Sequence, residues 1–144
     1  MALSDEDIRG ILKKSRTVAV YGMSKHADKA AHYVPAYLSR QGFHLIPINP
    51  TAGVIGGKTS YASLKDIPDA IDILEVFRPS DKVLDVVKEA VERRKARGDI
   101  TVVWLQEGIR NEAARKLAEE AGMLFIQNRC MKVTFKKLMK KGKP

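Results

Sequence analysis

The sequence predicts an α/β fold in which helices cover both faces of a parallel β-sheet. Five short apolar or β-branched runs lie between residues 17 and 127, and each is separated from the next by a helical or glycine-rich segment. The first run ends at Gly22 and the second ends at Asn49-Pro50, with one amphipathic helix between them. This alternation of strand, helix and strand is typical of βαβ units, whose strands run parallel.

The first helix is marked by its cap. Ser4 is followed three residues later by Asp7, which is a variant of the capping box, and we expect the helix to run to about Lys14. The first strand is then expected over residues 17–22, where a β-branched run leads into a glycine.

Pro35 limits where the second helix begins. The segment after residue 29 is apolar at helical spacing, at Ala30, Val34, Tyr37 and Leu38. Proline lacks a backbone donor and is tolerated only in the first turn of a helix. We therefore expect this helix to begin near His32 or Tyr33 and to end before Gly42.

The rest of the chain repeats the pattern of strand and helix. Further strands are expected at 43–48, 71–77, 100–105 and 123–127. The connections are expected to be a loop over 49–70 with a short helical turn at 63–67, a long helix capped by Ser80 and ending at Gly98, and a last regular helix from about Asn111 to Ala121.

The number of strands and their spacing predict one Rossmann-like, doubly wound domain over residues 1–135, followed by a basic C-terminal tail at residues 136–144. We expect the strand order 3-2-1-4-5, counted along the chain. Ligands of such sheets bind beyond the carboxyl ends of the strands, where the order reverses, which here is between strands one and four. The residues just past the strand ends are rich in glycine, hydroxyl and amide groups and poor in acid, which favours a polyanion over a cation.

Length and composition exclude several classes of protein. The 144 residues suffice for one domain with its own core. The chain has no apolar run of membrane-spanning length, and its acidic start lacks the apolar region of a signal peptide. The single cysteine, Cys130, cannot form an internal disulfide, and no histidine is placed by sequence to activate it as a nucleophile. We therefore expect a soluble, cytoplasmic protein.

The net charge of +9 is concentrated at the carboxyl end. Six lysines and no acidic residue follow residue 131, and without these lysines the charge of residues 1–131 is only +3. Two interpretations stay open: a solvated basic tail, or a tail that makes weak contacts with polyanions such as nucleic acid. The second is disfavoured because Phe135 is the only aromatic residue in this segment, and single-strand binding surfaces need aromatic rings.

The loop after the first strand lies where such folds hold phosphates, but it lacks the G-x-G-x-x-G fingerprint of dinucleotide enzymes. The second strand ends in Asn49-Pro50 and not in the acidic residue that would hold a ribose diol. Both features favour a phosphorylated ligand other than NAD. No spacing of Cys, His or carboxylate residues matches a metal site.

Six separate motifs lie between Ile8 and Val133: V-A-V-Y-G-M-S, A-H-Y-V-P-A-Y-L-S-R-Q-G-F-H-L-I-P-I-N-P, Y-A-S-L-K-D-I-P, D-I-L-E-V-F-R-P-S, V-V-W-L-Q-E-G-I-R-N-E-A-A and N-R-C-M-K-V. In this order they resemble the stand-alone CoA-binding domain proteins, a family similar to the amino-terminal CoA-binding domain of the succinyl-CoA synthetase α subunit. The resemblance implies a Rossmann-type domain that binds coenzyme A (CoA) or an acyl-CoA, with no catalytic activity well established for the family.

Matching the family's motifs position by position implies CoA-binding roles for residues at every strand end. The loop Gly22-Met23-Ser24-Lys25 would face the diphosphate, and Asn49-Pro50 would lie beside the adenosine half. The start of the second helix near His32 adds free N–H groups and a positive dipole end. The remaining candidates are Phe77, Arg78, Gln106, Gly108, Asn128 and Arg129.

Several of these residues also have a purely structural interpretation. Ser24 fits an ordinary polar loop, and His32 fits a partly buried histidine beside a helix start. Arg78 fits an ion pair with Asp81 or Glu107.

Three functions remain open. The first is a CoA-binding module without catalytic activity, such as a carrier, sensor or regulatory subunit. The second is an NAD(P)-binding, oxidoreductase-like domain, which is disfavoured by Asn49-Pro50 and by the lack of room for a separate substrate domain. The third is a nucleic-acid-associated protein that acts through the basic tail. A binding protein is favoured over an enzyme.

Overall fold

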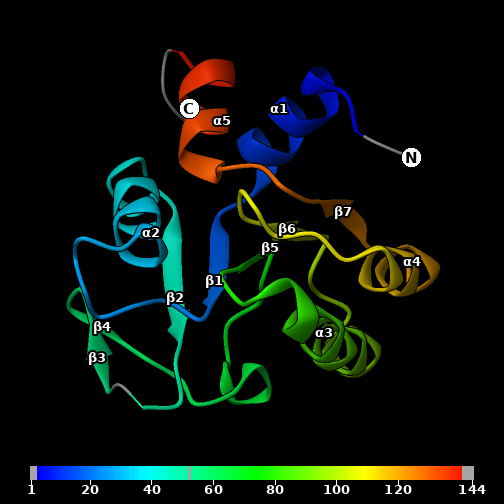
Figure 1. Cartoon of the computed structure of the whole chain (residues 1–144), viewed down its shortest axis with the longest axis horizontal. Coiled ribbons are helices and arrows are strands. Elements are labelled where there is room, and N and C mark those ends of the chain that lie inside the picture. The colour runs from blue at the N-terminus through cyan, green and yellow to red at the C-terminus, as the bar shows by residue number, and fades with distance from the viewer. Residues whose placement is uncertain (1–2, 52, 141–144) are drawn as a thin grey trace.

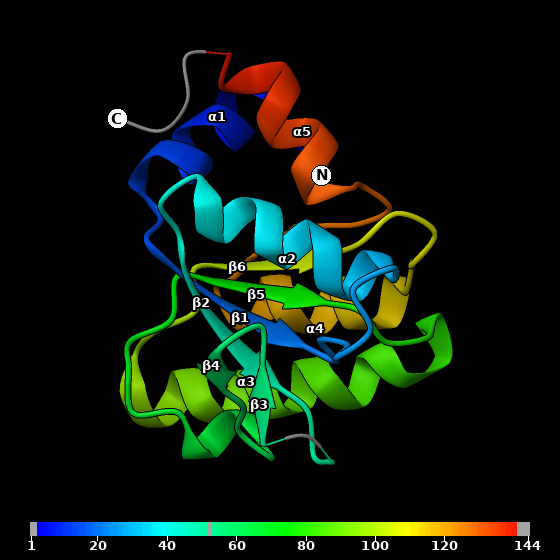
Figure 2. The ribbon, with the colours of Figure 1, turned by 90° about the vertical axis from the view of Figure 1, so that its left-hand side faces the viewer.

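The structure has three layers, with a parallel sheet in the middle. The computed structural model describes residues 3–51 and 53–140. The strands of the sheet are β1 (Thr17–Tyr21), β2 (His44–Ile48), β5 (Ile73–Val76), β6 (Val102–Leu105) and β7 (Leu124–Ile126). The helices are α1 (Asp5–Lys14), α2 (Ala30–Arg40), α3 (Val83–Arg97), α4 (Glu112–Glu120) and α5 (Met131–Leu138). One face of the sheet is covered by α1, α2 and α5, and the other by α3 and α4 (Figures 1 and 2).

The expected fold class, a five-stranded parallel sheet with helices on both faces, is confirmed. The expected strand order 3-2-1-4-5 is wrong. The observed order is β2-β1-β5-β6-β7, so the third sheet strand along the chain lies beside β1 in the middle and not at the outside. The point at which the strand order reverses is therefore between β1 and β5, and not between strands one and four.

The long connection from β2 to β5 decides this order. Both orders allow right-handed crossovers, so the handedness rule does not distinguish them. They differ in the face of the sheet that the connection covers. Leu64 and Ile67 of the connection are buried in the core on the α3 side, so the chain passes that face of β1 and emerges on its far side. Asp72 then fastens β5 to β1, because its carboxylate accepts the N–H groups of Arg16 (2.8 Å) and Thr17 (3.0 Å).

The same connection contains a hairpin that the sequence did not indicate. We expected a loop there, but β3 (Val54–Ile55) and β4 (Lys58–Thr59) pair antiparallel beyond β2 (Figure 2). The expected short helical turn at 63–67 is present as the 3-10 helix η1 (Leu64–Asp66).

The first helix forms as its cap predicts. The Ser4 hydroxyl accepts the Asp7 N–H at 3.1 Å, and the Asp7 carboxylate accepts the Ser4 N–H at 3.1 Å. These reciprocal bonds satisfy two of the backbone donors that a helix start leaves free.

The second helix begins earlier than expected, at Ala30, which places Pro35 in its second turn. Pro35 has no N–H group, so the carbonyl of Ala31, four residues before it, has no helical donor. The Ser24 N–H donates to this carbonyl at 3.1 Å. A bond from the preceding loop therefore replaces the missing helical bond, and it fixes the loop to the helix.

Two further expectations about helices are corrected. Ser80 does not cap the long helix. It begins the 3-10 helix η2 (Ser80–Lys82), and its hydroxyl accepts the Arg110 N–H at 3.1 Å. The helix that ends at Glu120 is not the last regular one, because α5 follows it.

Helix α5 includes the first residues of the expected tail. Phe135 and Leu138 are buried, as is Met139, which caps the helix. Residues 136–139 thus belong to α5 and its cap, and residues 141–144 lie outside the described residues. Among the helices of the described ranges, none is long and apolar enough to cross a membrane.

Glu75 is the exception to an otherwise apolar sheet interior. It lies on β5 in the middle of the sheet and is fully buried, and neither carboxylate oxygen has a hydrogen-bond partner in the structure. Burial alone raises the pKa of Glu75 from its ordinary value of 4.5 to about 8. The side chain is therefore mostly protonated and neutral at pH 7.

We expect Glu75 to make the stability of the fold decrease with pH. The folded-state pKa is the higher one, so the stabilisation is complete below about pH 4.5 and is lost as the pH rises towards about 8. Between pH 4.5 and 7 the loss is roughly 3 kcal/mol. Glu75→Gln cannot ionise, so its free energy of unfolding, measured in urea at pH 5 to 8, should lack this decline. Glu92→Gln, at an exposed site on α3, is the control that should keep the wild-type profile. Parallel profiles for wild type and Glu75→Gln would contradict the prediction.

Candidate functional site

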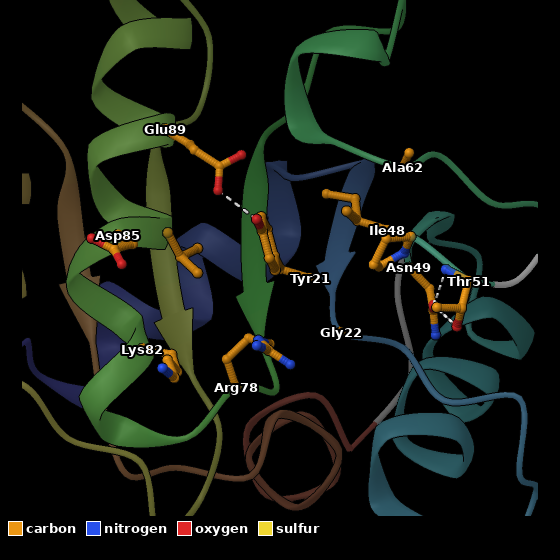
Figure 3. A pocket seen from close by; sticks show the side chains of 12 residues that line it. Tyr21, Gly22, Ile48, Asn49, Thr51, Ala62, Arg78, Lys82, Asp85 and Glu89 are labelled. Atoms are coloured by element: carbon orange, nitrogen blue, oxygen red, sulfur yellow. Dashed lines mark hydrogen bonds between the residues drawn. The ribbon is translucent and has the colours of Figure 1, made fainter.

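A cleft of about 480 Å³ lies at the carboxyl ends of β1, β2 and β5, on the side of α3 (Figure 3). Its position is the point where the strand order reverses, which is where open parallel sheets bind ligands. Its size lies in the range of small-molecule sites. The lining residues are Tyr21, Gly22, Ile48, Asn49, Pro50, Thr51, Ala62, Arg78, Lys82, Asp85, Val86 and Glu89.

Gly22 is required where β1 meets the end of β5. Its φ of +88° is a conformation that other residues rarely adopt. A Cβ atom at this position would lie 2.8 Å from the carbonyl oxygen of Phe77 and 3.1 Å from Cδ of Arg78. The Gly22 N–H also donates to the carbonyl of Ile48 at 2.9 Å, so the turn joins the ends of three strands. Only glycine suits this turn.

The cleft carries charges of both signs. Arg78 and Lys82 lie near its opening, and neither forms an ion pair within residues 3–51 and 53–140 (Figure 3). The expected structural ion pair of Arg78 with Asp81 or Glu107 is therefore not found. One arginine and one lysine without ionic partners at the edge of a cleft are suited to bind a phosphate group.

Acidic residues also line the cleft. Asp85 and Glu89 come from the first turns of α3, and the Tyr21 hydroxyl donates to the Glu89 carboxylate (Figure 3). Burial and this neighbouring carboxylate raise the pKa of Tyr21 well above its ordinary value. Tyr21 consequently stays protonated across the physiological pH range.

Asn49 ties the end of β2 to the loop that follows β1. Its Nδ2 donates to the carbonyl of Met23 at 2.9 Å, and its Oδ1 accepts both the N–H and the hydroxyl of Thr51, each at 2.9 Å. Every polar atom of the side chain is thus bonded to the chain itself. Asn49 positions the loop, and Pro50 beside it forms part of the cleft wall.

The loop from Met23 to Lys29 lies on the other side of Gly22, before α2. Met23 is buried beneath it, and Lys25 is exposed. The Ser24 hydroxyl accepts the His26 N–H at 3.0 Å, which leaves its own proton available for donation. His32 is half-buried, and its Nδ1 lies 2.7 Å from the carbonyl of Ser24, so Nδ1 is the protonated, donating nitrogen.

The start of α2 has free donors, but not at His32. The His32 N–H donates to the carbonyl of Lys29 at 2.9 Å. The N–H groups of Ala30 and Ala31 have no acceptor in the described chain, and Lys29 provides no side-chain cap. The free donors at the positive end of the helix dipole are therefore two residues earlier than expected.

The other expected site residues lie outside the cleft, where each has a partner of its own. Gln106 is buried, and its Oε1 accepts the N–H of Met131. Asn128 accepts the N–H of Gly108 at 2.7 Å. The side chain of Arg129 lies 3.6 Å from Asp5 on α1.

Two further residues at this edge face the α2 side. The half-buried Phe77 side chain packs against the core beneath α2 and α5. Cys130 packs against the same core at the start of α5. Among the residues that the structure describes, no group of His, Cys, Asp and Glu side chains is arranged to hold a metal ion.

Several cleft residues were missed by the sequence analysis. Lys82, Asp85 and Glu89 follow one another at helical spacing and share one side of α3. This periodicity is visible in the sequence, but the order 3-2-1-4-5 places strand three and the helix after it at the outside of the sheet, away from the expected site. Tyr21 is the last residue of β1, whereas the expected site residues all lie beyond the strand ends or at the start of the second helix.

We expect Gly22→Ala to destabilise the fold more than Gly108→Ala. Gly108 has nearly the same φ, +86°, but a Cβ atom there would have no neighbour within 4 Å. The positive φ costs each variant about 1–2 kcal/mol. The contact with Phe77 should add about 1–3 kcal/mol for Gly22→Ala alone. Urea denaturation of both variants measures the difference, and equal losses would mean that the ends of β1 and β5 separate easily.

Comparison with known proteins identifies the family. Residues 16–136 match the family model described as a CoA binding domain. The chain is 36% identical to YneT of Bacillus subtilis (strain 168) over 130 residues, which are 90% of this chain and 93% of YneT. A solved structure from Thermus thermophilus has a TM-score of 0.87 and 38% identity, and the match covers 94% of this chain and 99% of that one.

Part of the chain is also similar to a larger enzyme. A stretch of 80 residues, 54% of this chain, is 31% identical to the ADP-forming acetate–CoA ligase II of Archaeoglobus fulgidus, of which it spans 12%. The family match, unlike this partial one, extends from the first strand to the last helix. The protein belongs to the CoA-binding domain family.

Proposed function

We propose that the protein binds CoA, or an acyl-CoA, across the carboxyl ends of β1 and β5. One observation supports the proposal beyond the family match. Gly22 lies between a cleft with two cations and a helix start with two N–H groups, none of which has a partner among the residues that the structure describes. A ligand that lies over Gly22 reaches both. CoA has both the length and the chemical groups for this, because it joins a phosphorylated nucleoside to a diphosphate and a flexible arm.

The cleft suits the nucleoside part of CoA. Its walls include the apolar side chains of Ile48, Pro50 and Val86, against which a flat heterocycle packs well. Arg78 and Lys82 at the opening would meet phosphate oxygens. Asp85 also lines the cleft, and its carboxylate can accept hydrogen bonds from amino or hydroxyl groups.

The loop before α2 suits the diphosphate. The Ser24 hydroxyl keeps its proton for donation, and the N–H groups of Ala30 and Ala31 lie at the positive end of the helix dipole. Lys25 adds an exposed positive charge. The loop is already held by Asn49 and His32, so little conformational freedom is lost when a ligand binds.

We also propose that the protein holds CoA without transforming it, as a carrier, sensor or regulatory module. Tyr21 and Glu89 form a hydrogen-bonded pair in the cleft wall, and burial together with this bond raises the pKa of the tyrosine, so it stays protonated. A protonated, bonded tyrosine is a poor general base. Incubation with acetyl-CoA, followed by mass spectrometry of the small molecules, tests this point, because the thioester should be recovered intact.

We expect CoA to stabilise the fold more than NAD or NADP does. At a concentration 100 times the dissociation constant, CoA should add about 2.7 kcal/mol, which raises the melting temperature of a chain of this length by about 9 °C. Thermal denaturation with each ligand at equal concentration measures the shift. An equal or larger shift with NAD would remove the basis for the CoA assignment.

We expect the CoA affinities of two loop variants to differ in their dependence on salt. Ser24→Ala removes a hydrogen bond to a charged oxygen, so CoA affinity should decrease about tenfold to a hundredfold at low and high salt alike. Lys25 is exposed, so Lys25→Ala should have a smaller effect that shrinks as salt rises. Isothermal titration at two salt concentrations measures both.

The control for this pair is Ser24→Thr, which keeps the hydroxyl and should keep most of the affinity. It also guards against a purely structural effect, because the Ser24 hydroxyl holds the His26 N–H within the loop. Unchanged CoA affinity in Ser24→Ala, with the fold intact, would show that the diphosphate does not lie in this loop.

A further inference from the structure

Helices α2 and α5 lie side by side on the same face of the sheet (Figure 2). Lysine side chains of α5 lie over tyrosine rings of α2. The Nζ atom of Lys132 lies 5.3 Å from the ring centroids of both Tyr33 and Tyr37. The Nζ atom of Lys136 lies 5.4 Å from the ring centroid of Tyr37. These four residues form what is called here the basic-aromatic face.

The basic-aromatic face lies in a region of positive charge. The sequence contains no Asp or Glu between Lys29 and Lys65, or anywhere after Glu120. Neither α2 nor α5 therefore contributes an acidic residue. From the neighbouring α1, Asp5 approaches Lys137 to 3.6 Å, which leaves Lys132 and Lys136 without an acidic partner in the described chain.

The tyrosines differ in their surroundings. Tyr37 is anchored, because its ring packs edge-on against Phe135 at a centroid distance of 6.1 Å. Tyr33 is 45% exposed, so its ring is accessible from solvent. The pair therefore combines a fixed ring with an exposed ring one helical turn away, each with a lysine over it.

We propose that the basic-aromatic face binds single-stranded nucleic acid, with a base stacked on Tyr33 and phosphates held by Lys132 and Lys136. Surfaces that bind single strands combine positive charge with exposed aromatic rings, because every base has a face that stacks on a ring. The basic segment after residue 131 has only one aromatic residue, Phe135, and it is buried. The fold supplies the missing rings from α2, about a hundred residues earlier in the chain.

Other polyanions fit this face less well. An anionic membrane would favour several large apolar side chains directed outward. The largest apolar residues of α5, Phe135 and Leu138, are directed into the core instead, and Val133 is the exposed one. Duplex DNA offers phosphates but keeps its base faces stacked, so it would use the lysines and leave Tyr33 unused.

The test is fluorescence anisotropy of the full chain with labelled oligothymidylate of about 16 nucleotides, a length typical of single-strand sites. The same measurement is made with a duplex of that length and with phosphatidylserine vesicles. Tyr33→Leu should weaken single-strand binding about fivefold to a hundredfold, the value of one stacked base, without changing the salt dependence.

The paired lysine variant tests the phosphate contacts. Lys132→Gln with Lys136→Gln should make the slope of log affinity against log salt less steep by about 1.4, at about 0.7 for each contact. The charge-matched control is Lys95→Gln with Lys116→Gln, at exposed positions on α3 and α4, which should keep the wild-type slope. Thermal denaturation verifies that each variant is folded.

The outcomes separate the proposal from its rivals. It is supported if the single strand binds more tightly than the duplex and depends on Tyr33. It is overturned if duplex and single strand bind equally with no effect of Tyr33→Leu, since the lysines then act as a general polyanion surface. Binding to vesicles but not to the oligonucleotide, or no binding at all, also overturns it.

Discussion

The pairing of β1 with β5 is the constraint on which the rest of the structure depends. It is secured at both ends of the sheet. At the amino end, the Asp72 carboxylate accepts two N–H groups from the start of β1. At the carboxyl end, Gly22 lets β1 approach so closely that any side chain would meet the carbonyl of Phe77. Because these two strands are neighbours, the strand order reverses between them, and Arg78 and α3 are brought to the same cleft as the end of β2.

The loop after β1 is held before any ligand arrives. Asn49 bonds the carbonyl of Met23, His32 bonds the carbonyl of Ser24, and the Ser24 N–H bonds the carbonyl that Pro35 leaves free. Each of these bonds is worth about 0.5–1.5 kcal/mol to stability. Their greater importance is for binding, because a loop that is already ordered loses little entropy when it meets a phosphate. Asn49, His32 and Ser24, which were expected to touch the ligand, thus also hold the loop in place.

Arg93 and Glu75 are both buried ionisable residues, and the structure accommodates them in opposite ways. Arg93 is almost fully buried, yet its guanidinium bonds the Asp99 carboxylate and the carbonyls of Leu64, Ile67 and Asp69. These bonds fasten the connection between β2 and β5 to α3. Glu75 has no partner and instead stays neutral through its raised pKa. A buried group either finds partners for its charge or gives the charge up.

The sequence by itself determined where the sheet strands lie and which family the chain belongs to, but not every helix boundary. Turn, cap and periodicity signals located all five sheet strands and the glycine turn at Gly22, and the order of motifs indicated a CoA-binding domain. Only the tertiary structure decided the strand order, the early start of α2 and the meeting of Tyr33 with Lys132. The physical reason is the range of the interactions. Caps and periodicity act over a few residues, so they are visible in the sequence. The bond from Arg16 to Asp72 and the burial of Leu64 under α3 join segments distant in the chain, and the bond that compensates for Pro35 depends on how the preceding loop folds back on α2, so no helical or strand periodicity records them.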